Sequence, residues 1–398
     1  MTNNKDKKVL NVPNLRFPEF TGEWKKERLD EIAELSKGIG ISKEQLSSNG
    51  NPCILYGELY TKYKSEIISE VISKTNIEKN KLKHSKQNDV IIPCSGETAV
   101  DIAVARCVPF DNVLLGGDLN IIRLHKYDGA FMAYQLNSKR KIEIAKLAQG
   151  VSVVHLYGEN LKSINTFNPS LQEQQKIVRL LSLLDERIKV QNKIIEKLKS
   201  LIKGLNNTLQ YGTEGKSVCL GDILLERSER SRTNNQHEVL SSTVKGIFSQ
   251  REYFSKDIAS ENNVGYKIIR LYDVVLSPQN LWMGNINYND RFEIGIVSPS
   301  YKVFSIADGY DNQFVAAMLK THRALYSYMM VSEQGASIVR RNLNMEAFSQ
   351  LVFKIPSLDK QREIGYAISL LKSQLKTANK IIKAYTSQKQ YLLRQMFI

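Results

Sequence analysis

Apolar side chains recur at alternating steps of four and three residues along two stretches of this chain, 169–211 and 356–398. This spacing is typical of a heptad seam, in which one stripe of a long helix faces a partner. In the first stretch, nine of the ten seam positions are apolar: Ile177, Leu181, Leu184, Ile188, Gln191, Ile195, Leu198, Ile202, Leu205 and Leu209. The second seam runs through Ile364, Ile368, Leu371, Leu375, Ala378, Ile382, Tyr385, Lys389, Leu392 and Met396.

The two stretches are copies of one another. At an offset of 187 positions, fifteen of forty-three residues are identical, including the entry Pro-Ser-Leu-x-x-Gln at Pro169 and at Pro356. An internal repeat of this kind predicts a duplicated structural unit. A helix of about 40 residues is about 60 Å long, and a narrow apolar stripe must be buried. We expect the two helices to pair with each other; the alternative is that each packs on its own domain.

The first helix has clear start and stop signals. Asn168-Pro169 disfavours helix before it, and Ser170 with Glu173 predicts a capping box. Gly212 follows the last seam turn as a C-terminal stop. The second copy keeps Ser357 but has Lys360 at the box position, which predicts a weaker cap.

The remaining sequence predicts two mixed domains of the α/β (α+β) class. In the first, short strand candidates alternate with Gly, Pro and Asn, and helical spacing follows them. The strand candidates are Cys53–Tyr56, Asp89–Pro93, Ala103–Pro109 and Asn120–Leu124, and the helical stretches are Phe131–Leu136 and Ile142–Leu147. The second domain repeats this plan with different loops: Leu220–Ile223 corresponds to Leu29–Ile32, and Gln334–Val339 to Gln149–Val154. The predicted order is domain 1–167, helix 168–212, domain 213–355 and helix 356–398.

The net charge of the chain indicates what kind of partner it binds. The 398 residues contain 56 Lys+Arg and 41 Asp+Glu, a net charge of +15, which points first to a polyanion, most often nucleic acid. The four cysteines, Cys53, Cys94, Cys107 and Cys219, show neither a paired motif nor nearby histidine ligands. No segment resembles a signal peptide, and no run approaches 18 apolar residues, so we expect a cytosolic chain without a membrane partner.

Catalytic motifs are missing. There is no Asn/Asp-Pro-Pro-aromatic motif of an adenine methyltransferase, and Gly215-Lys216-Ser217 lacks the first glycine of a phosphate loop because Gln210 stands there. Asp185, Glu186 and Lys189 lie along a helix rather than in a nuclease-like cluster. His155 follows Ser152 without a fitting third residue. We therefore expect a binding protein.

These features together resemble the specificity (S) subunits of type I restriction-modification enzymes. The resemblance covers essentially the whole chain and is carried by the twofold repeat, the Pro-Ser-Leu-x-x-Gln entries, the Gln-Gly-x-Ser segments and the opening from Trp24 to Ile32. It implies two target-recognition domains that bind the two halves of a bipartite site in double-stranded DNA, joined by two antiparallel spacer helices. It also implies a non-catalytic subunit on which two methyltransferase subunits and restriction/translocase subunits assemble. No cofactor is then expected here, since S-adenosylmethionine, ATP and Mg²⁺ belong to the partner subunits.

For such a protein, cationic side chains bind phosphates, whereas amide, hydroxyl and Arg groups on loops read base edges. In the first domain the candidates are Lys37, Lys43, Tyr56, Ser95, Thr98, Ser152 and His155. In the second they are Ser241, Ser242, Thr243, Lys245, Gln279, Asn280, Trp282, Asn285, Arg340, Arg341 and Asn342. Each has an alternative interpretation as an ordinary solvated loop residue, and Trp282 as a core residue.

Three other classes of protein remain as alternatives. A stand-alone DNA-binding regulator shares the charge and the loops but does not need two long helices. An enzyme with a fused recognition module is disfavoured by the missing motifs. A coiled-coil scaffold leaves the two mixed domains without a role.

Overall fold

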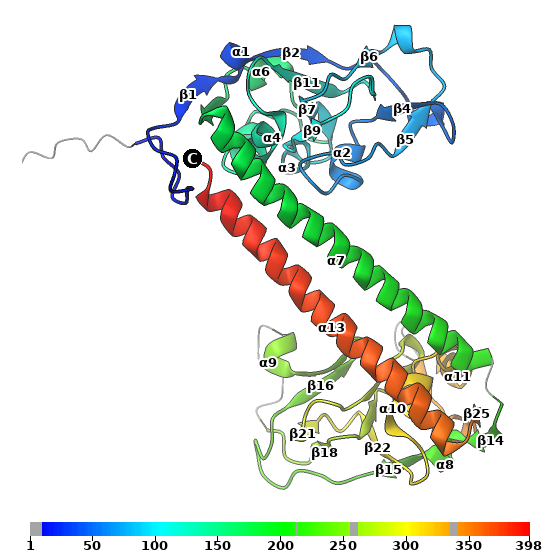
Figure 1. The fold of residues 1–398 in the computed structure, drawn as a ribbon. Helices are drawn as coiled ribbons and strands as arrows, with labels where there is room; N and C mark the ends of the chain where they lie inside the picture. Colours follow the sequence, from blue (N-terminus) through cyan, green and yellow to red (C-terminus); the bar gives the residue numbers. More distant parts are fainter. Residues whose placement is uncertain (1–9, 212–213, 255–261, 335–340) are drawn as a thin grey trace, which may run out of the picture. The chain divides into compact units, whose positions relative to one another are not determined.

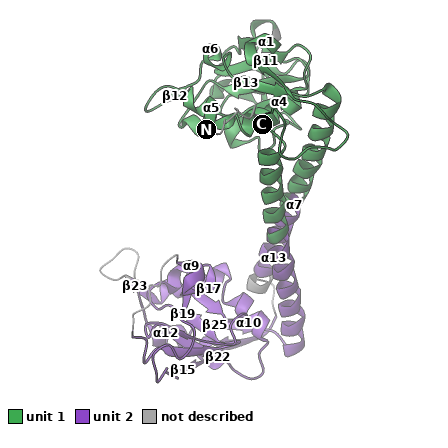
Figure 2. Cartoon of the chain, turned by 90° about the vertical axis from the view of Figure 1, so that its left-hand side faces the viewer, with its two compact units in different colours: residues 1–192, 380–398 green, residues 193–379 purple. Residues whose placement is uncertain are grey.

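The computed structural model describes residues 10–211, 214–254, 262–334 and 341–398. The chain forms two compact units, each described here by itself (Figure 2). Unit 1 contains residues 1–192 and 380–398, and unit 2 contains residues 193–379. Each unit therefore combines one mixed domain with half of each long helix.

Unit 1 is built on a four-stranded antiparallel sheet. Its strand order is β2-β11-β7-β9, formed by Ala33–Lys37, Leu119–Leu124, Asp89–Pro93 and Arg106–Val108. Strand β7 is buried along its whole length: Asp89 at its start pairs with Arg123 (2.7 Å), and the four residues after it are apolar. The helices α4 (Gly129–Asn137) and α5 (Lys141–Lys146) pack with this sheet around one apolar core.

A second sheet and several short elements complete the domain of unit 1. The five-stranded sheet has the order β3-β5-β4-β10-β6. The elements are β3 Leu46–Ser47, β4 Asn51–Ile54, β5 Ser73–Thr75, β6 Lys83–His84, β10 Leu114–Leu115, β8 Ser95–Gly96, β12 Val154–His155, α1 Leu29–Ile32, α2 Glu58–Thr61, α3 Ala99–Ile102 and α6 Gly158–Leu161. A strand pair, β1 (Lys25–Arg28) with β13 (Asn165–Asn168), closes the domain directly before the long helix.

Unit 2 repeats this framework. Its four-stranded sheet has the order β15-β22-β19-β20, and its closing pair is β14 with β25. These elements are β14 Lys216–Cys219, β15 Leu224–Arg227, β19 Val274–Leu276, β20 Ile286–Tyr288, β22 Lys302–Ile306 and β25 Val352–Ile355. Around them lie β16 Leu240–Thr243, β17 Gly246–Ser249, β18 Lys267–Arg270, β21 Ile294–Val297, β23 Ser332–Gln334, β24 Arg341–Leu343, α8 Leu220–Ile223, α9 Gln250–Tyr253, α10 Asn312–Met318, α11 His322–Met330 and α12 Met345–Ser349. The internal repeat inferred from sequence is thus a repeat of topology.

The two long helices are α7 (Leu171–Tyr211) and α13 (Leu358–Gln395). In unit 1 the start of α7 packs with the end of α13, since Ile177 and Leu181 share a core with Met396. In unit 2 the order is reversed, because Ile202 and Leu375 line one pocket. The helices therefore run antiparallel and pair with each other (Figure 1), and they also pack on the domains.

A buried glutamine ties the start of α7 to its domain. The Gln174 amide donates to the Pro169 carbonyl oxygen (2.9 Å) and accepts from the Asp128 backbone N–H (3.0 Å). The Asp128 carboxylate in turn caps α4 by accepting from the Phe131 N–H (2.8 Å). The last residue of the Pro-Ser-Leu-x-x-Gln entry thus connects α7 to the domain helix α4.

Unit 2 contains the same contact. Gln361 donates to the Pro356 carbonyl oxygen (3.0 Å) and accepts from the Asp311 N–H (2.9 Å). Asp311 caps α10 through the Phe314 N–H (2.8 Å). Side chains conserved between the two copies therefore make the same bonds.

The predicted capping box of α7 is only half present. The Glu173 N–H donates to the Ser170 hydroxyl (3.3 Å), as expected. The Glu173 carboxylate does not return to the helix start; it accepts two hydrogen bonds from Arg16 (both 2.7 Å) and one from the Trp24 indole (3.2 Å). A charged partner outcompetes the local backbone donor because a charge-assisted bond is stronger. The predicted stop, Gly212, lies outside the described residues.

One polar seam residue, Lys389, closes a charged cluster in unit 1. Its ammonium lies 2.5 Å from a Glu66 carboxylate oxygen and 2.5 Å from one of Asp185. Asp185 also accepts from the Tyr134 hydroxyl (2.6 Å) and the Ser65 hydroxyl (3.0 Å). Burial, reinforced by Asp185, raises the pKa of Tyr134 far above its ordinary value. The domain, α7 and α13 therefore meet at one buried ion cluster.

Replacing Lys389 by Met should destabilise unit 1 by about 3–5 kcal/mol, since it leaves two buried carboxylates without their cation. Chemical denaturation of the full chain measures the change. Lys383→Met, at an exposed position of the same helix, is the control and should change the free energy of unfolding by less than about 0.5 kcal/mol. Adding Glu66→Gln and Asp185→Asn to Lys389→Met should recover part of the loss. Equal stability of the Lys389 and Lys383 variants would refute the buried-cluster assignment.

Candidate nucleic-acid interface

In unit 1, three of the predicted residues gather around one aspartate. The Lys37 ammonium lies 3.2 Å from a carboxylate oxygen of Asp118, and the Ser95 hydroxyl donates to the other oxygen (3.2 Å). Ser95 is paired with His155 across β8 and β12. The hydrogen bond that the Lys37 ammonium donates to Asp118 raises the pKa of Lys37, so this exposed ammonium stays charged at neutral pH. The cluster offers a cation from β2 and, next to Ser95, an imidazole from β12.

The other predicted residues of unit 1 lie in different settings. Thr98 uses its hydroxyl to cap α3, accepting from the Asp101 N–H, so that oxygen is already engaged. Tyr56 is half-buried, Lys43 is exposed, and Ser152 is exposed on the hairpin that ends at His155.

The hairpin that carries Ser152 also exposes apolar side chains. Val151 is 98% exposed and Val153 is 52% exposed. Gly150 adopts a left-handed conformation, with φ of 120°, which allows the tight turn. Exposed apolar side chains beside polar ones suit contact with thymine methyl groups as well as base edges.

In unit 2 three predicted readers are buried. Ser241, Ser242 and Asn285 are 8%, 2% and 4% exposed. The Ser242 hydroxyl donates to the Asn285 amide oxygen (2.9 Å), and the Asn285 amide donates to the Ser242 carbonyl oxygen (3.0 Å). Asn287 adds bonds to the Ser242 hydroxyl and the Thr243 carbonyl oxygen, both 2.7 Å. This network holds the β16–β17 hairpin against β20, so the Ser242 and Asn285 side chains position the loops.

A lysine without a carboxylate partner among the described residues completes that network. The Lys320 ammonium donates to the Gly284 carbonyl oxygen (2.7 Å) and to the Asn287 amide oxygen (2.9 Å). Burial, with a contribution from Lys372, lowers the pKa of Lys320 to about 8.

The accessible candidates of unit 2 lie on two loops and one strand. Lys245 is exposed at the tip of the β16–β17 hairpin, with Thr243 half-buried and Ser241 buried below it. Gln279 and Asn342 are exposed, whereas Asn280, Trp282 and Arg341 are half-buried. The Arg341 guanidinium lies over the Trp282 ring, 4.9 Å from its centroid, so Trp282 is not a simple core residue. Arg340 lies outside the described residues.

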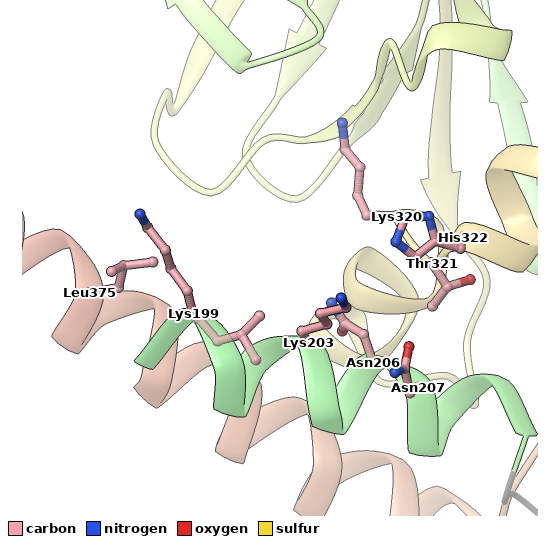
Figure 3. A pocket seen from close by; sticks show the side chains of 9 residues that line it. Lys199, Lys203, Asn206, Asn207, Lys320, Thr321, His322 and Leu375 are labelled. Atoms are coloured by element: carbon pink, nitrogen blue, oxygen red, sulfur yellow. The ribbon is translucent and has the colours of Figure 1, made fainter. Parts of the chain in front are cut away.

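A cavity of about 270 Å³ lies where α7 meets the turn between α10 and α11. Its charged lining residues are Lys199, Lys203 and Lys320, and its other polar residues include Asn206 and His322 (Figure 3). Lys199 pairs with Glu196 (2.9 Å). Lys320 extends away from the other lining side chains toward the loops of the domain. The cavity is a junction between helix and domain rather than a converging set of ligands.

Three residues that hold the candidate sites together were not among the predicted site residues. For Asp118 the sequence carries a signal, since it follows a Gly-Gly pair that is typical of a tight turn, and its backbone is left-handed, with φ of 57°. Asn287 and Lys320 gave no signal, because their roles depend on contacts between distant segments.

Three of the four cysteines are buried. Burial raises the pKa of the Cys53 thiol to about 11 and of the Cys94 and Cys107 thiols to about 12. These three thiols stay protonated at neutral pH and are poor nucleophiles. Within the described residues no cluster of His, Cys, Asp and Glu suits a metal ion, and no helix has the length and apolar character to cross a membrane.

Comparison with known proteins finds relatives of the first half of the chain. Residues 21–200 match the type I restriction modification DNA specificity domain. A Haemophilus influenzae protein inferred to be a type I restriction enzyme specificity subunit is 27% identical over 206 residues, which cover 48% of this chain and 50% of that protein. Over its first half, the chain is similar to the type I restriction-modification specificity subunits.

A solved structure extends the likeness of fold to the whole chain. The S subunit of a type I restriction-modification system from M. genitalium covers 97% of this chain and 99% of its own, with a TM-score of 0.63 and 17% identity. The chain spans only about half the length of the curated relative that it matches, and for the second half the comparisons show a shared fold.

Replacing Lys320 by Met tests the network beneath the unit 2 loops. Below pH 8 the folded wild-type chain buries a charged ammonium. Between about pH 8 and the ordinary pKa of lysine, about 10.4, the unfolded chain binds more protons than the folded chain, so wild-type stability rises with pH. The Lys320→Met variant lacks this rise. The amount by which its free energy of unfolding falls short of the wild-type value should therefore grow between pH 7 and pH 9.5. Denaturation at each pH, with exposed Lys354→Met as control, measures it. A constant deficit would show that Lys320 keeps an ordinary pKa.

Proposed function

We propose that this chain is the DNA-recognition subunit of a type I restriction-modification complex. Each mixed domain binds one half of a bipartite, asymmetric site in double-stranded DNA. Two methyltransferase subunits and restriction/translocase subunits assemble with the chain. They supply adenine methylation, DNA cleavage and the sites for S-adenosylmethionine, ATP and Mg²⁺, whereas this subunit catalyses neither reaction.

The observation that carries the proposal is the repetition of one framework with different loops. The four-stranded sheets have corresponding strand orders in the two units, and both domains hold a long helix through the same glutamine contact. The loops differ: unit 1 has the Lys37–Asp118 ion pair, whereas unit 2 has the Arg341–Trp282 stack. Two similar frameworks with different recognition loops suit two unlike half-sites.

The net charge of +15 supports DNA as the ligand. Binding through Lys and Arg releases counterions, so affinity should fall as salt rises. A stand-alone DNA-binding regulator shares this charge and is the second candidate. It would bind its site tightly and specifically without partner subunits, which distinguishes the two functions.

Exchange of one domain tests the proposal. The chain is expressed with its methyltransferase partner, and methylated adenines are mapped across the host genome. Replacing residues 213–355 by the second domain of another member of the family should change one half of the methylated motif and leave the other half intact. A motif that is unchanged, or changed in both halves, would contradict the division of labour between the domains.

The length of the helices should set the unread gap between the half-sites. Inserting about four residues within Lys193–Lys203, alone or with a matched insertion at the equivalent 380–390, should lengthen the gap and keep both half-sites. The matched insertion preserves the antiparallel pairing and should retain more methylation activity. Motif mapping measures both variants; an altered half-site with an unchanged gap would refute this role of the helices.

A further inference from the structure

Corresponding hairpins in the two domains place a side chain on an aromatic ring. In unit 1, Gln149 and His155 exchange backbone hydrogen bonds (2.7 and 2.9 Å), and the His155 ring stacks with Tyr157 at a centroid distance of 6.3 Å. In unit 2, Gln334 is paired with Arg341, whose guanidinium lies 4.9 Å from the Trp282 ring centroid. The partner of the hairpin glutamine is thus supported by a ring in both domains.

The Arg341 side chain is held in place but is not neutralised. Its backbone N–H donates to the Gln279 carbonyl oxygen (3.1 Å), which fixes the strand beside the 279–285 loop. Stacking on Trp282 fixes the plane of the guanidinium. Within the described parts of the chain, no carboxylate forms an ion pair with it. Arg291 provides the contrast, since it lies at the same 4.9 Å over Phe292 but pairs with Glu252 at 2.8 Å.

Two buried polar atoms in this corner lack a hydrogen-bond partner among the described residues: the Arg341 Nε, a donor, and the Asn280 Oδ1, an acceptor. Asn280 directly follows Gln279, which holds the Arg341 strand. A buried polar atom without a partner costs free energy and calls for an explanation. Both atoms are covered in the free chain, so a ligand that brings an acceptor and a donor to this corner bonds to them once the half-buried Asn280 and Arg341 side chains turn toward it.

The chemistry of that ligand follows from the two groups. A guanidinium donates to two acceptors side by side, which a phosphate and the guanine O6/N7 edge both provide. The Asn280 amide oxygen needs a donor, which a phosphate lacks. The major-groove edge of a G·C pair has the guanine acceptors beside the cytosine amino donor, and it therefore matches both groups.

We propose that Arg341, oriented by Trp282, reads the guanine of one G·C pair in the half-site bound by unit 2, with Asn280 facing the cytosine amino group. This inference rests on the proposed function and adds the specificity-determining residue and the base pair it selects. Trp282 acts as a positioning residue, since it contacts the guanidinium and not the base.

The test uses the complex of the full chain with its methyltransferase partner. Wild type should methylate a bipartite motif with a fixed G·C pair in the half assigned to residues 213–355 by domain exchange. Arg341→Lys keeps the charge but loses the bidentate geometry, so discrimination at that single position should fall about 5- to 150-fold. Trp282→Ala should relax the same position, and Trp282→Phe should retain it. Arg291→Lys, the matched stacked arginine, should leave the motif unchanged.

A modified duplex tests the contact without relying on a variant that must fold. Replacing the selected guanine by 7-deazaguanine removes one acceptor, so the wild-type complex should bind more weakly. The Arg341→Lys complex should show little further loss, because the two changes remove the same contact. A loss of affinity spread evenly over all sequences would indicate a phosphate contact and overturn the inference. Full discrimination in Arg341→Lys would overturn it too. Absence of any bipartite motif in wild type would instead overturn the proposed function.

Discussion

The contact on which the arrangement of each unit depends is a single buried amide. Gln174 and Gln361 are 0% and 2% exposed, and each joins the carbonyl of the preceding proline to the capping aspartate of a domain helix. Proline fixes the backbone before the helix, and the amide then fixes the first turn against the domain. A helix of about 40 residues extends about 60 Å, so a small error in angle at its start becomes a large displacement at its far end. A short polar contact with strict geometry limits that error better than apolar packing, which tolerates sliding.

The same duplicated framework uses different chemistry beyond that contact. Gly365 occurs about two turns into the second helix, and a Cβ there would approach an Asp311 carboxylate oxygen to 2.3 Å; the equivalent residue of the first helix is Val178. Lys389 joins a buried ion cluster in unit 1, whereas the equivalent residue of α7, Ile202, lines a cavity in unit 2. Each helix end is therefore adapted to the domain on which it packs. Ion pairing at one end and close backbone approach at the other disfavour exchange of the two helices.

Sequence periodicity was sufficient for the features that depend on local spacing. The heptad seams and the strand Asp89–Pro93 were predicted correctly, because each is encoded within a few consecutive turns or residues. The topological repeat was predicted correctly because the two copies keep the same order of short segments. The site was less predictable. The cluster of Lys37, Ser95 and His155 depends on Asp118, and Ser242 and Asn285 were candidates for reading bases although they are buried. A polar loop residue has the same signature whether it faces solvent or another polar residue, and only tertiary contacts distinguish the two.

Affinity and selectivity place opposite demands on the side chains of a DNA-binding surface. Many mobile lysines provide sequence-independent attraction to phosphates, but a mobile side chain loses conformational entropy when it must meet one base edge. In the proposed function, a selective group therefore benefits from being held before DNA arrives, and the structure contains two ways of holding it. Buried networks such as Ser242–Asn285–Asn287 stiffen the loops from below, and aromatic rings support His155 and Arg341 from the side. Because these supports lie in loops that differ between the units while the glutamine contacts are shared, recognition can diverge between the two domains without disturbing the helices that both domains hold.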